Sequence, residues 1–229
     1  MKRLAVLTIG QAPRDDVVPH MVKFLPPEVQ VIQEGLLDGF SPEEIEALHP
    51  EPGDYILVSR LADGRQVELG RSLIEASLRS SVSRLAQGHD VTVLFCTGEL
   101  MVPSDGLVLK PDLVLESVIR ILMKSGPRRM GLITPSRKQI PQTEEKWLET
   151  LGPRVRRLRG TAASPYSWEK EWPAAARDLS GVDFVVMDCM GYSPAMKAHV
   201  SAALSVPVIL PVTLVGRILA EILDPGDST

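Results

Sequence analysis

The sequence predicts an α/β protein of two similar halves, each a parallel Rossmann-like sheet, with a β-hairpin inserted in the first half. Two observations carry this prediction for the 229-residue chain. Short apolar runs alternate with segments of helical periodicity, which is typical of parallel strands covered on both faces. Two strand motifs also recur in the same order along the chain.

The apolar runs have the length of strands and are too short for buried helices. They cover residues 4–8, 29–32, 55–61, 91–96, 130–134, 184–189 and 206–210. Residues 55–69 depart from the alternation, because they have the pattern of an antiparallel hairpin. Its turn is expected at Asp63-Gly64, a dipeptide that tolerates positive φ at both central positions of a tight turn.

The helices have clear starting signals. Apolar residues recur at helical spacing after Gly70, and Pro111 stands where the first residue of another helix belongs. Ser41 and Ser193 each precede a proline and are expected to cap helices. A last helix is expected over residues 213–223.

An internal repeat is visible in the sequence itself. Residues 3–8 (RLAVLT) match residues 129–134 (RMGLIT) in type at every position. Residues 91–98 match residues 184–191 around a shared Cys-x-Gly. Each half therefore begins with a strand that ends in Thr and later contains a strand that ends in Cys.

The repeat implies a domain division. We expect a first half of residues 1–126 and a second half of residues 127–229, with the boundary at Gly126-Pro127. This division leaves open whether the last strand and helix pack with the first half or with the second. The Thr-to-Cys separation is 88 residues in the first half and 55 in the second. The extra 33 residues of the first half roughly accommodate the hairpin.

Composition excludes several classes of protein. Hydrophobic residues make up 44% and charged residues 24%, which is ordinary for a globular chain and unlike a disordered or collagenous one. A net charge of −4 disfavours a nucleic-acid-binding role. The most apolar stretch, residues 206–215, contains two prolines and is shorter than the roughly 20 residues of a membrane span. Two cysteines without a signal peptide predict reduced thiols in the cytoplasm.

The two cysteines are the main candidates for catalysis. Thr8, Cys96, Thr134 and Cys189 stand at the carboxyl ends of expected strands, where parallel α/β sheets bind ligands. If the two half-sheets face each other, one thiol lies on each wall of a central cleft. One thiolate then removes a proton from a carbon acid, and the other thiol returns a proton on the opposite face. This chemistry requires no cofactor.

Other residues are expected to shape an anion site around the thiols. Gly98 and Gly191 permit close approach of the backbone to an anion, and Thr97 adds a hydroxyl. Arg14 is a candidate partner for a carboxylate. The expected ligand-binding residues are Thr8, Gln11, Arg14, Thr97, Gly98, Thr134, Gly191 and Tyr192.

Each candidate also has a structural interpretation. A buried cysteine often packs as a small hydrophobe. The hairpin, with Arg60 and Arg65, is a lid, a homodimer contact or an exposed ribbon, and Asp188 either tunes Cys189 or caps a helix. The four histidines lack metal-ligand spacing, and Gly-x-Gly-x-x-Gly and Walker patterns are absent, so neither a metal nor a nucleotide cofactor is expected.

Three motifs make the chain similar to the AroM protein family: TIGQAPRD at residues 8–15, SRLADGRQV at residues 59–67 and VMDCMGY at residues 186–192. This family is grouped with the aspartate/glutamate racemase-like superfamily. The resemblance implies two α/β halves with pseudo-twofold symmetry and a cysteine on each side of a central cleft.

The resemblance also has a limit. Racemases of that superfamily usually have Cys-Asn-Thr at the first thiol and Cys-Thr-His at the second. This chain has Cys96-Thr-Gly98 and Cys189-Met-Gly191. The resemblance therefore also admits the single-thiol reactions of the superfamily, decarboxylation and cis–trans isomerisation of dicarboxylates.

The sequence thus predicts a cytoplasmic, cofactor-independent racemase- or isomerase-like enzyme for a small carboxylate. The alternative is a non-catalytic regulatory protein on the same fold that binds a small carboxylate or an aromatic metabolite. Neither a nucleic acid nor a membrane is expected as a partner, and the hairpin is a candidate homodimer contact.

Overall fold

The first sheet is built around β1 (Arg3–Thr8), which lies between two neighbours. The strand order is β2-β1-β5-β6, with β2 at Gln30–Gly35, β5 at Val91–Leu94 and β6 at Val108–Leu109. Each pair of neighbouring strands is parallel. The structure is a computed structural model that describes residues 1–102, 106–126, 128–224 and 226.

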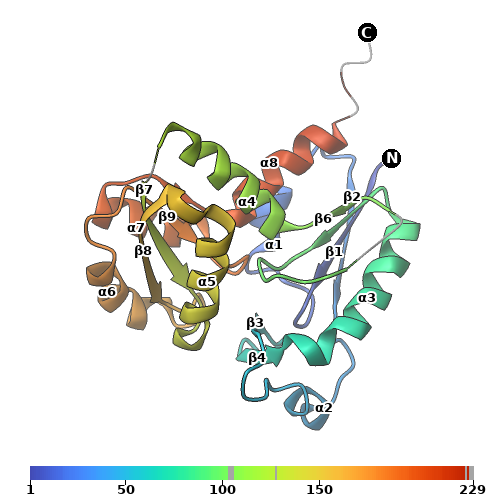
Figure 1. Cartoon of the computed structure of the whole chain (residues 1–229). Helices are drawn as coiled ribbons and strands as arrows, with labels where there is room; N and C mark the ends of the chain where they lie inside the picture. The colour runs from blue at the N-terminus through green and yellow to red at the C-terminus, as the bar shows by residue number, and fades with distance from the viewer. Residues whose placement is uncertain (103–105, 127, 225, 227–229) are drawn as a thin grey trace. The chain divides into compact units, whose positions relative to one another are not determined.

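Helices cover both faces of the first sheet (Figure 1). α3 (Arg71–Gly88) packs on one face, where Ile74, Leu78, Val82 and Leu85 share a buried cluster with Ala5 and Leu7 of β1. α1 (Val18–Val22) and α8 (Pro211–Leu223) pack together, since Gly216 of α8 lies directly against the backbone of Met21. The apolar residues of β1 are therefore buried on both faces, as the sequence pattern predicts.

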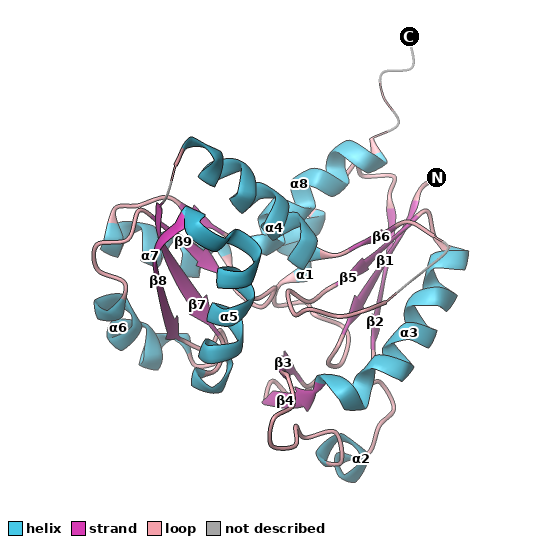
Figure 2. Ribbon diagram, viewed as in Figure 1, coloured by secondary structure: helices cyan, strands magenta, loops and turns pink. Residues whose placement is uncertain are grey.

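The second sheet repeats this arrangement around β7 (Arg128–Thr134). Its order is β8-β7-β9-β10, with β8 at Val155–Ala162, β9 at Phe184–Met187 and β10 at Val208–Ile209. Its helices are α4 (Pro111–Leu122), α5 (Ile140–Leu151), α6 (Trp168–Asp178) and α7 (Pro194–Leu204). Figure 2 shows α5 on one side of this sheet and α6 and α7 on the other.

The register of the central strands confirms the internal repeat. Leu4 pairs with Val91 in the first sheet, and Met130 pairs with Phe184 at the equivalent point of the second. The same loop contact precedes each pair. The backbone N–H of Arg3 donates to Asp90 Oδ2 at 2.7 Å, and that of Arg129 donates to Asp183 Oδ2 at 2.7 Å.

The expected hairpin is confirmed. β3 (Ile56–Arg60) pairs antiparallel with β4 (Gln66–Gly70), and α2 (Pro42–Glu46) precedes them. Only Gly64 of the Asp63-Gly64 turn has positive φ, at 91°, so the turn differs from the expected one in which both residues take that conformation. The chain runs from β8 to α6 without such elements, so α2 and the hairpin are an insertion of the first half.

Cap positions also agree with the sequence. The side chain of Ser41 accepts a hydrogen bond from the backbone of Glu44 at the start of α2. The side chain of Ser193 accepts one from the backbone of Met196 at the start of α7. No described helix combines the length and apolar character that crossing a membrane requires.

The chain divides into two compact units. Unit 1 comprises Met1–Pro111 and Val212–Thr229, and unit 2 comprises Asp112–Pro211. α4 follows β6 of the first sheet yet belongs to unit 2, whereas α8 follows β10 of the second sheet yet belongs to unit 1. The boundary between Pro111 and Asp112 lies before the expected boundary at 126/127. Residue 127 falls outside the described residues. α8 belongs to the first unit, and β10 stays in the second sheet.

Candidate functional site

Cys96 lies in a tight loop at the carboxyl end of β5. The backbone N–H of Phe95 continues the sheet by donating to Leu7 of β1 at 2.8 Å, and that of Cys96 turns back to Leu94 at 2.7 Å. Two residues later, the N–H of Gly98 donates to Cys96 Sγ with an N–S distance of 3.3 Å. The thiol therefore faces a backbone donor of its own loop.

Cys189 lies in the same loop geometry at the end of β9. The N–H of Asp188 donates to Ile133 of β7 at 2.9 Å, and that of Cys189 donates to Met187 at 2.8 Å. The N–H of Gly191 then donates to Cys189 Sγ at 3.3 Å. Both thiols are half-buried, and neither forms a disulfide. A backbone donor aimed at sulfur favours the thiolate over the thiol. The thiolate is the form that acts as base or nucleophile.

The two loops need glycine for the same reason but have different neighbours. A Cβ on Gly98 would lie 2.4 Å from Leu57 Cδ2 of the hairpin and 3.4 Å from Cys96 Sγ. A Cβ on Gly191 would lie 2.9 Å from the hydroxyl of Tyr166 and 3.5 Å from Cys189 Sγ. An apolar side chain thus closes the Cys96 loop, whereas a phenol closes the Cys189 loop.

The threonines at the two central strand ends are buried and hydrogen-bonded. Thr8 Oγ1 accepts from the N–H of Gly10 at 3.4 Å. Thr134 Oγ1 lies within donating distance of the carbonyls of Ser136, at 3.0 Å, and Thr161, at 3.3 Å. Thr97 is also buried, with 6% of its surface exposed. These hydroxyls shape the loops from within.

Gln11 connects three segments of unit 1. Its side-chain amide donates to the carbonyl of Leu37 at 3.2 Å and accepts from the N–H of Ala62 at 2.8 Å. Its backbone N–H donates to the carbonyl of Arg60 at 3.1 Å. The residue therefore attaches the hairpin to the loops that follow β1 and β2.

Arg14 belongs to a charged cluster in the loop after β1. Its guanidinium binds both carboxylate oxygens of Asp16, at 2.9 and 3.0 Å, and only 4% of Arg14 is exposed. Arg60 of the hairpin reaches the same carboxylate at 3.5 Å. Burial disfavours the ionised form of Asp16, but the hydrogen bonds and charge of Arg14, with the charge of Arg60, outweigh it and lower the pKa of Asp16. Two guanidiniums therefore share this carboxylate, and the charge of Arg60 also acts on Asp63 of the hairpin.

Tyr192 is buried completely beneath the Cys189 loop. Its hydroxyl donates to the carbonyl of Ala163 at 2.9 Å, and its ring lies edge-on to Trp168 at a centroid distance of 5.8 Å. Burial, together with the nearby Cys189 and Asp188, raises the pKa of Tyr192 well above its ordinary value. The phenol is neutral and supports the loop from below.

The structure thus gathers the predicted residues in two groups. Thr8, Gln11, Arg14, Cys96, Thr97 and Gly98 lie at the carboxyl edge of the first sheet, in unit 1, and Thr134, Cys189, Gly191 and Tyr192 lie at that of the second, in unit 2. In the described part of the chain, no three His, Cys, Asp or Glu side chains are grouped as metal ligands.

The model of one protein family, described as AroM protein, matches residues 4–223. The chain belongs to the AroM protein family. A comparison with curated protein sequences gave no significant match.

Solved structures show which fold this AroM chain has. Allantoin racemase from Pseudomonas fluorescens is 14% identical, with a TM-score of 0.57 over 96% of this chain and 90% of the racemase. Glutamate racemase from Francisella tularensis, in complex with D-glutamate, is 11% identical, with a TM-score of 0.58 over 97% of this chain and 81% of the racemase. Arylmalonate decarboxylase is 16% identical, with a TM-score of 0.54 over 99% of this chain and 94% of the enzyme. The AroM chain therefore has the racemase-like α/β fold.

Two residues near the AroM thiols, Tyr166 and Lys146, were not singled out by sequence reasoning. Tyr166 follows β8. The charged residues of β8 break the apolar pattern of a strand, so neither the strand nor the residue after it was expected. Lys146 and Trp147 of α5 are buried, and both contact Asp188 Oδ2, at 3.7 and 2.9 Å. No pattern in α5 distinguishes Lys146 from an exposed helical lysine, because its burial depends on an acidic partner 42 residues away.

Proposed function

We propose that this AroM protein is a cofactor-independent racemase- or isomerase-like enzyme that acts on a small carboxylate through Cys96, Cys189 or both. The observation that carries the proposal is the equivalence of the two thiol loops. Each cysteine follows the strand beside the central strand of its sheet, and each sulfur accepts an N–H at 3.3 Å from the glycine two residues later. Sequence repetition alone does not require a backbone donor at both sulfurs.

The chemistry follows from the thiols and their loops. One thiolate takes the proton from the carbon next to the carboxylate, and the electron pair is held on the substrate as an enolate-like carbanion. The other thiol then gives its proton to the opposite face of the same carbon, so the products are the inverted substrate and an enzyme with its proton moved from one sulfur to the other. That the two sulfurs face each other across one substrate stays a prediction.

Charges in unit 1 support a carboxylate as the ligand. The cluster of Arg14, Asp16 and Arg60 carries one positive charge in excess. It lies after β1, the strand paired with β5 of the Cys96 loop. Guanidinium groups bind carboxylates in a planar, bidentate way. Arg14 is buried and already bound to Asp16, so Arg60, whose side chain is 30% exposed, is the group that attracts an anionic substrate to this edge of the sheet. Thr97, next to Cys96 at the same edge of the first sheet, adds a hydroxyl.

The solved structures of similar fold support this class of reaction by analogy. Two are named as racemases and one as a decarboxylase. The triplets Cys96-Thr-Gly98 and Cys189-Met-Gly191 favour a substrate other than an ordinary amino acid, because the Asn and His of amino-acid racemases are replaced here. The same replacement is the observation that favours a non-catalytic carboxylate-binding protein as the second candidate.

Hydrogen exchange in D₂O tests the proposal directly. The chain is incubated with single enantiomers of 2-amino, 2-hydroxy and 2-aryl carboxylates and with malonates, and loss of the Cα proton signal is followed by ¹H NMR. We expect exchange on at least one substrate, abolished in Cys96→Ser or in Cys189→Ser. Circular dichroism of both variants controls for folding. Exchange that survives both substitutions would remove the thiols from the mechanism.

The same assay separates the two candidates. A carboxylate that binds, as measured by calorimetry, but exchanges no proton and loses no CO₂ supports the binding protein.

The proposal assigns the chain to the cytoplasm, where both thiols stay reduced. Neither a membrane nor a nucleic acid is assigned as a partner. A dimer through the hairpin stays a prediction that sedimentation velocity of the Arg60→Glu variant tests.

A further inference from the structure

Asp188 is a buried carboxylate next to Cys189 in the chain. Its side chain is 4% exposed, and its backbone N–H continues the sheet by donating to Ile133. One carboxylate oxygen, Oδ2, accepts from Trp147 Nε1 at 2.9 Å and lies 3.7 Å from Lys146 Nζ. The other oxygen, Oδ1, is also buried and has no hydrogen-bond donor among the described residues. The carboxylate is therefore held from α5 through one oxygen.

The fold of the loop does not require this carboxylate. In the internal repeat, Phe95 stands in the first half where Asp188 stands in the second. The backbone N–H of Phe95 continues the first sheet in the same way, and its side chain is buried as well. A buried ion pair is often no more stabilising than apolar residues of the same volume, and a buried oxygen without a donor is costly. Stability alone therefore does not account for Asp188.

A charge at position 188 acts on the buried side of the Cys189 loop. The Cα atoms of consecutive residues are about 3.8 Å apart, so Asp188 stands close to the thiol. The hydroxyl of Tyr192 lies beneath the same loop, and its pKa is raised first by burial and then by the charges of Cys189, Asp188, Tyr166 and Glu171. The field that these acidic groups produce also opposes a negative charge on Cys189 Sγ.

Lys146 acts in the opposite direction, because it carries the positive charge of the buried pair. Its ammonium group is 3.7 Å from Asp188 Oδ2, which is longer than a hydrogen-bonded ion pair. Asp188 is the covalent neighbour of Cys189, whereas Lys146 belongs to α5. The carboxylate is therefore the nearer end of the pair, and Lys146 reduces its effect on the thiol without cancelling it.

The charged group at the Cys96 loop has the opposite sign. Arg71 Nη1 donates to the backbone carbonyl of Glu99, three residues after Cys96, at 3.3 Å. The same guanidinium lies over the ring of Tyr55, 4.7 Å from its centroid. The side chain of Glu99 is exposed, so water screens its charge. Both thiols are half-buried, and the difference between them is therefore one of charge.

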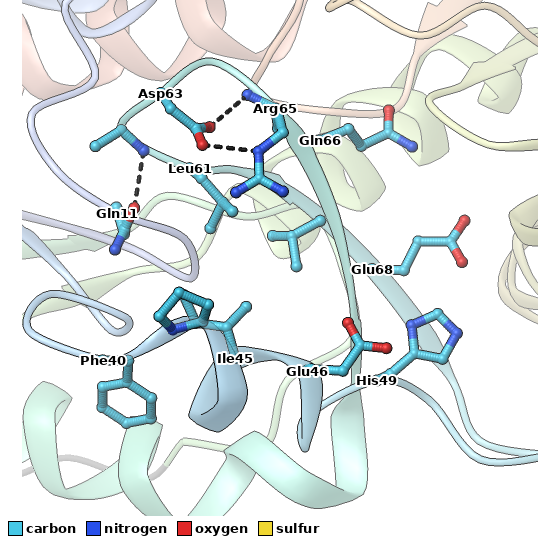
Figure 3. A pocket seen from close by; sticks show the side chains of 13 residues that line it. Gln11, Phe40, Ile45, Glu46, His49, Leu61, Asp63, Arg65, Gln66 and Glu68 are labelled. Carbon is cyan, nitrogen blue, oxygen red and sulfur yellow. Dashed lines mark hydrogen bonds and ion pairs between the residues drawn. The ribbon is translucent and has the colours of Figure 1, made fainter.

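The hairpin brings an apolar side chain to the Cys96 loop. Leu57 is the residue that would meet a Cβ on Gly98. At the hairpin turn, Asp63 and Arg65 pair with each other at 2.7 Å (Figure 3). In the described residues of unit 1 no Asp or Glu is buried. A buried carboxylate beside the thiol is thus a feature of the second half.

We propose that Asp188 is a positioning residue that keeps Cys189 protonated at rest, so that Cys96 is the base and Cys189 the proton donor of the proposed reaction. The Cys96 thiolate takes the proton from the substrate carbon, and the electron pair stays on the substrate. Cys189 then gives its proton to the opposite face, and proton exchange with water restores both thiols. The roles of base and donor rest on the proposed function, whereas the order of ionisation does not.

The order of ionisation is measured without a substrate. Alkylation of each thiol by iodoacetamide is followed by mass spectrometry across the titration range of thiols. We expect the titration midpoint of Cys96 to lie below that of Cys189 by about one pH unit, as for one buried charge that a partner partly offsets. Equal midpoints, or the reverse order, would overturn the assignment.

Asp188→Asn removes the charge and keeps an oxygen for Trp147. We expect the midpoint of Cys189 to fall by about one pH unit and that of Cys96 to stay unchanged. Alkylation of Cys189 then becomes about threefold faster at pH 7 and about threefold slower at high pH, because the more acidic thiolate is the weaker nucleophile. A loosened loop would instead accelerate alkylation at every pH. That result, or an unchanged midpoint, would overturn the proposal.

Asp183→Asn is the matched control. Asp183 directly precedes β9 and pairs with Arg129 at 2.6 Å, so the same charge is removed about 16 Å away along an extended strand. We expect the Cys189 midpoint to stay unchanged in this variant. An equal fall in Asp183→Asn and Asp188→Asn would show a general charge effect and overturn the proposal.

A double variant controls for folding. Asp188→Asn combined with Lys146→Met leaves neither member of the buried pair without its partner charge. We expect its Cys189 midpoint to lie below that of the unmodified chain, by less than in Asp188→Asn alone. A midpoint at or above that of the unmodified chain would show that Lys146 is the nearer charge and would overturn the proposal. Because no substrate is present, these results are distinguishable from a failure of proton exchange in D₂O.

Discussion

The phenol of Tyr166 distinguishes the two thiols, and its removal is expected to slow reactions of Cys189 alone. Tyr166 Oη and Cys189 Sγ lie 2.9 and 3.5 Å from the point that a Cβ on Gly191 would occupy, so the two atoms are at most 6.4 Å apart. That separation allows a direct hydrogen bond or one bridging water. At the equivalent point beside Cys96 the neighbour is the methyl group of Leu57.

The size of the effect follows from this geometry. A hydroxyl that stabilises a thiolate by about 1 kcal/mol raises its population about fivefold. The nucleophilicity of a thiolate falls as its basicity falls, with a coefficient of about 0.5, so the alkylation rate changes about two- to threefold. We therefore expect Tyr166→Phe to slow alkylation of Cys189 by iodoacetamide two- to threefold at pH 7, with Cys96 unchanged.

Two controls separate this electrostatic role from a structural one. Tyr55→Phe removes a phenol hydroxyl from the hairpin side of unit 1, where the Tyr55 ring lies 3.8 Å from the Cβ position of Gly98, and is expected to leave the Cys189 rate unchanged. Above the titration range of the thiol all of the sulfur is thiolate, so the slowing by Tyr166→Phe is replaced by an acceleration of about twofold, because the thiolate of the variant is the more basic nucleophile. A slowing that persists at high pH, or that affects both thiols, would refute the reasoning.

Three further variants test the packing of the Cys96 loop, the ion pair of Asp16 and the hydrogen bond of Tyr192. Gly98→Ala places a Cβ 2.4 Å from Leu57 Cδ2, so urea unfolding should show a loss of about 1–3 kcal/mol that Leu57→Val partly restores; a neutral Gly98→Ala would contradict the described contact. The pKa of Asp16 is lowered in the fold, so its contribution is complete above the ordinary value of 3.8 and is lost as the pH falls through its lowered value. Asp16→Asn should therefore cost about 1–2 kcal/mol at pH 7 and nothing at the acid end of a stability profile, whereas a pH-independent loss would argue against the ion pair. Tyr192→Phe leaves the buried carbonyl of Ala163 without its donor and should lower stability by about 1–3 kcal/mol in the same assay, a loss that an exposed hydroxyl would not produce.

Much of the fold was predictable because its central strands are buried on both faces. β1, β5, β7 and β9 are continuous apolar runs, and each was located from that property. The Cys-x-Gly loops were predictable for a related reason, since a repeated strand end implies a repeated turn. The N–H of the glycine that donates to each sulfur is a feature that the repeat does not require.

β8 was missed because its composition is that of an exposed segment. Arg156, Arg157 and Arg159 interrupt the apolar pattern of Val155–Ala162, and the strand lies at the edge of its sheet, paired only with β7 in the described structure. An edge strand tolerates charge because one side and part of a face are open to water. Missing β8 also concealed Tyr166, which follows it.

The candidate site shows a second limit of local sequence reasoning. Gln11 and Arg14 stand in a loop where polar residues are equally at home as ligands or as structural bridges. The structure uses the Gln11 amide to bind two backbone groups, and the Arg14 guanidinium to bind Asp16. The two backbone partners of Gln11 lie 26 and 51 residues away, so no spacing in the sequence indicates them.

The assignment of α4 to unit 2 and α8 to unit 1 has a consequence for the order in which the protein is made. Unit 2 is one continuous segment, Asp112–Pro211, and all of it is synthesised before residues 212–223 of α8 leave the ribosome. Unit 1 therefore lacks one of its helices until the synthesis of unit 2 is complete. A truncation at residue 211 would remove no residue of unit 2 and would still expose the apolar surface of unit 1 that Val215 and Leu219 cover. α8, which follows all of unit 2 in the chain, thus completes the unit whose synthesis begins before that of unit 2.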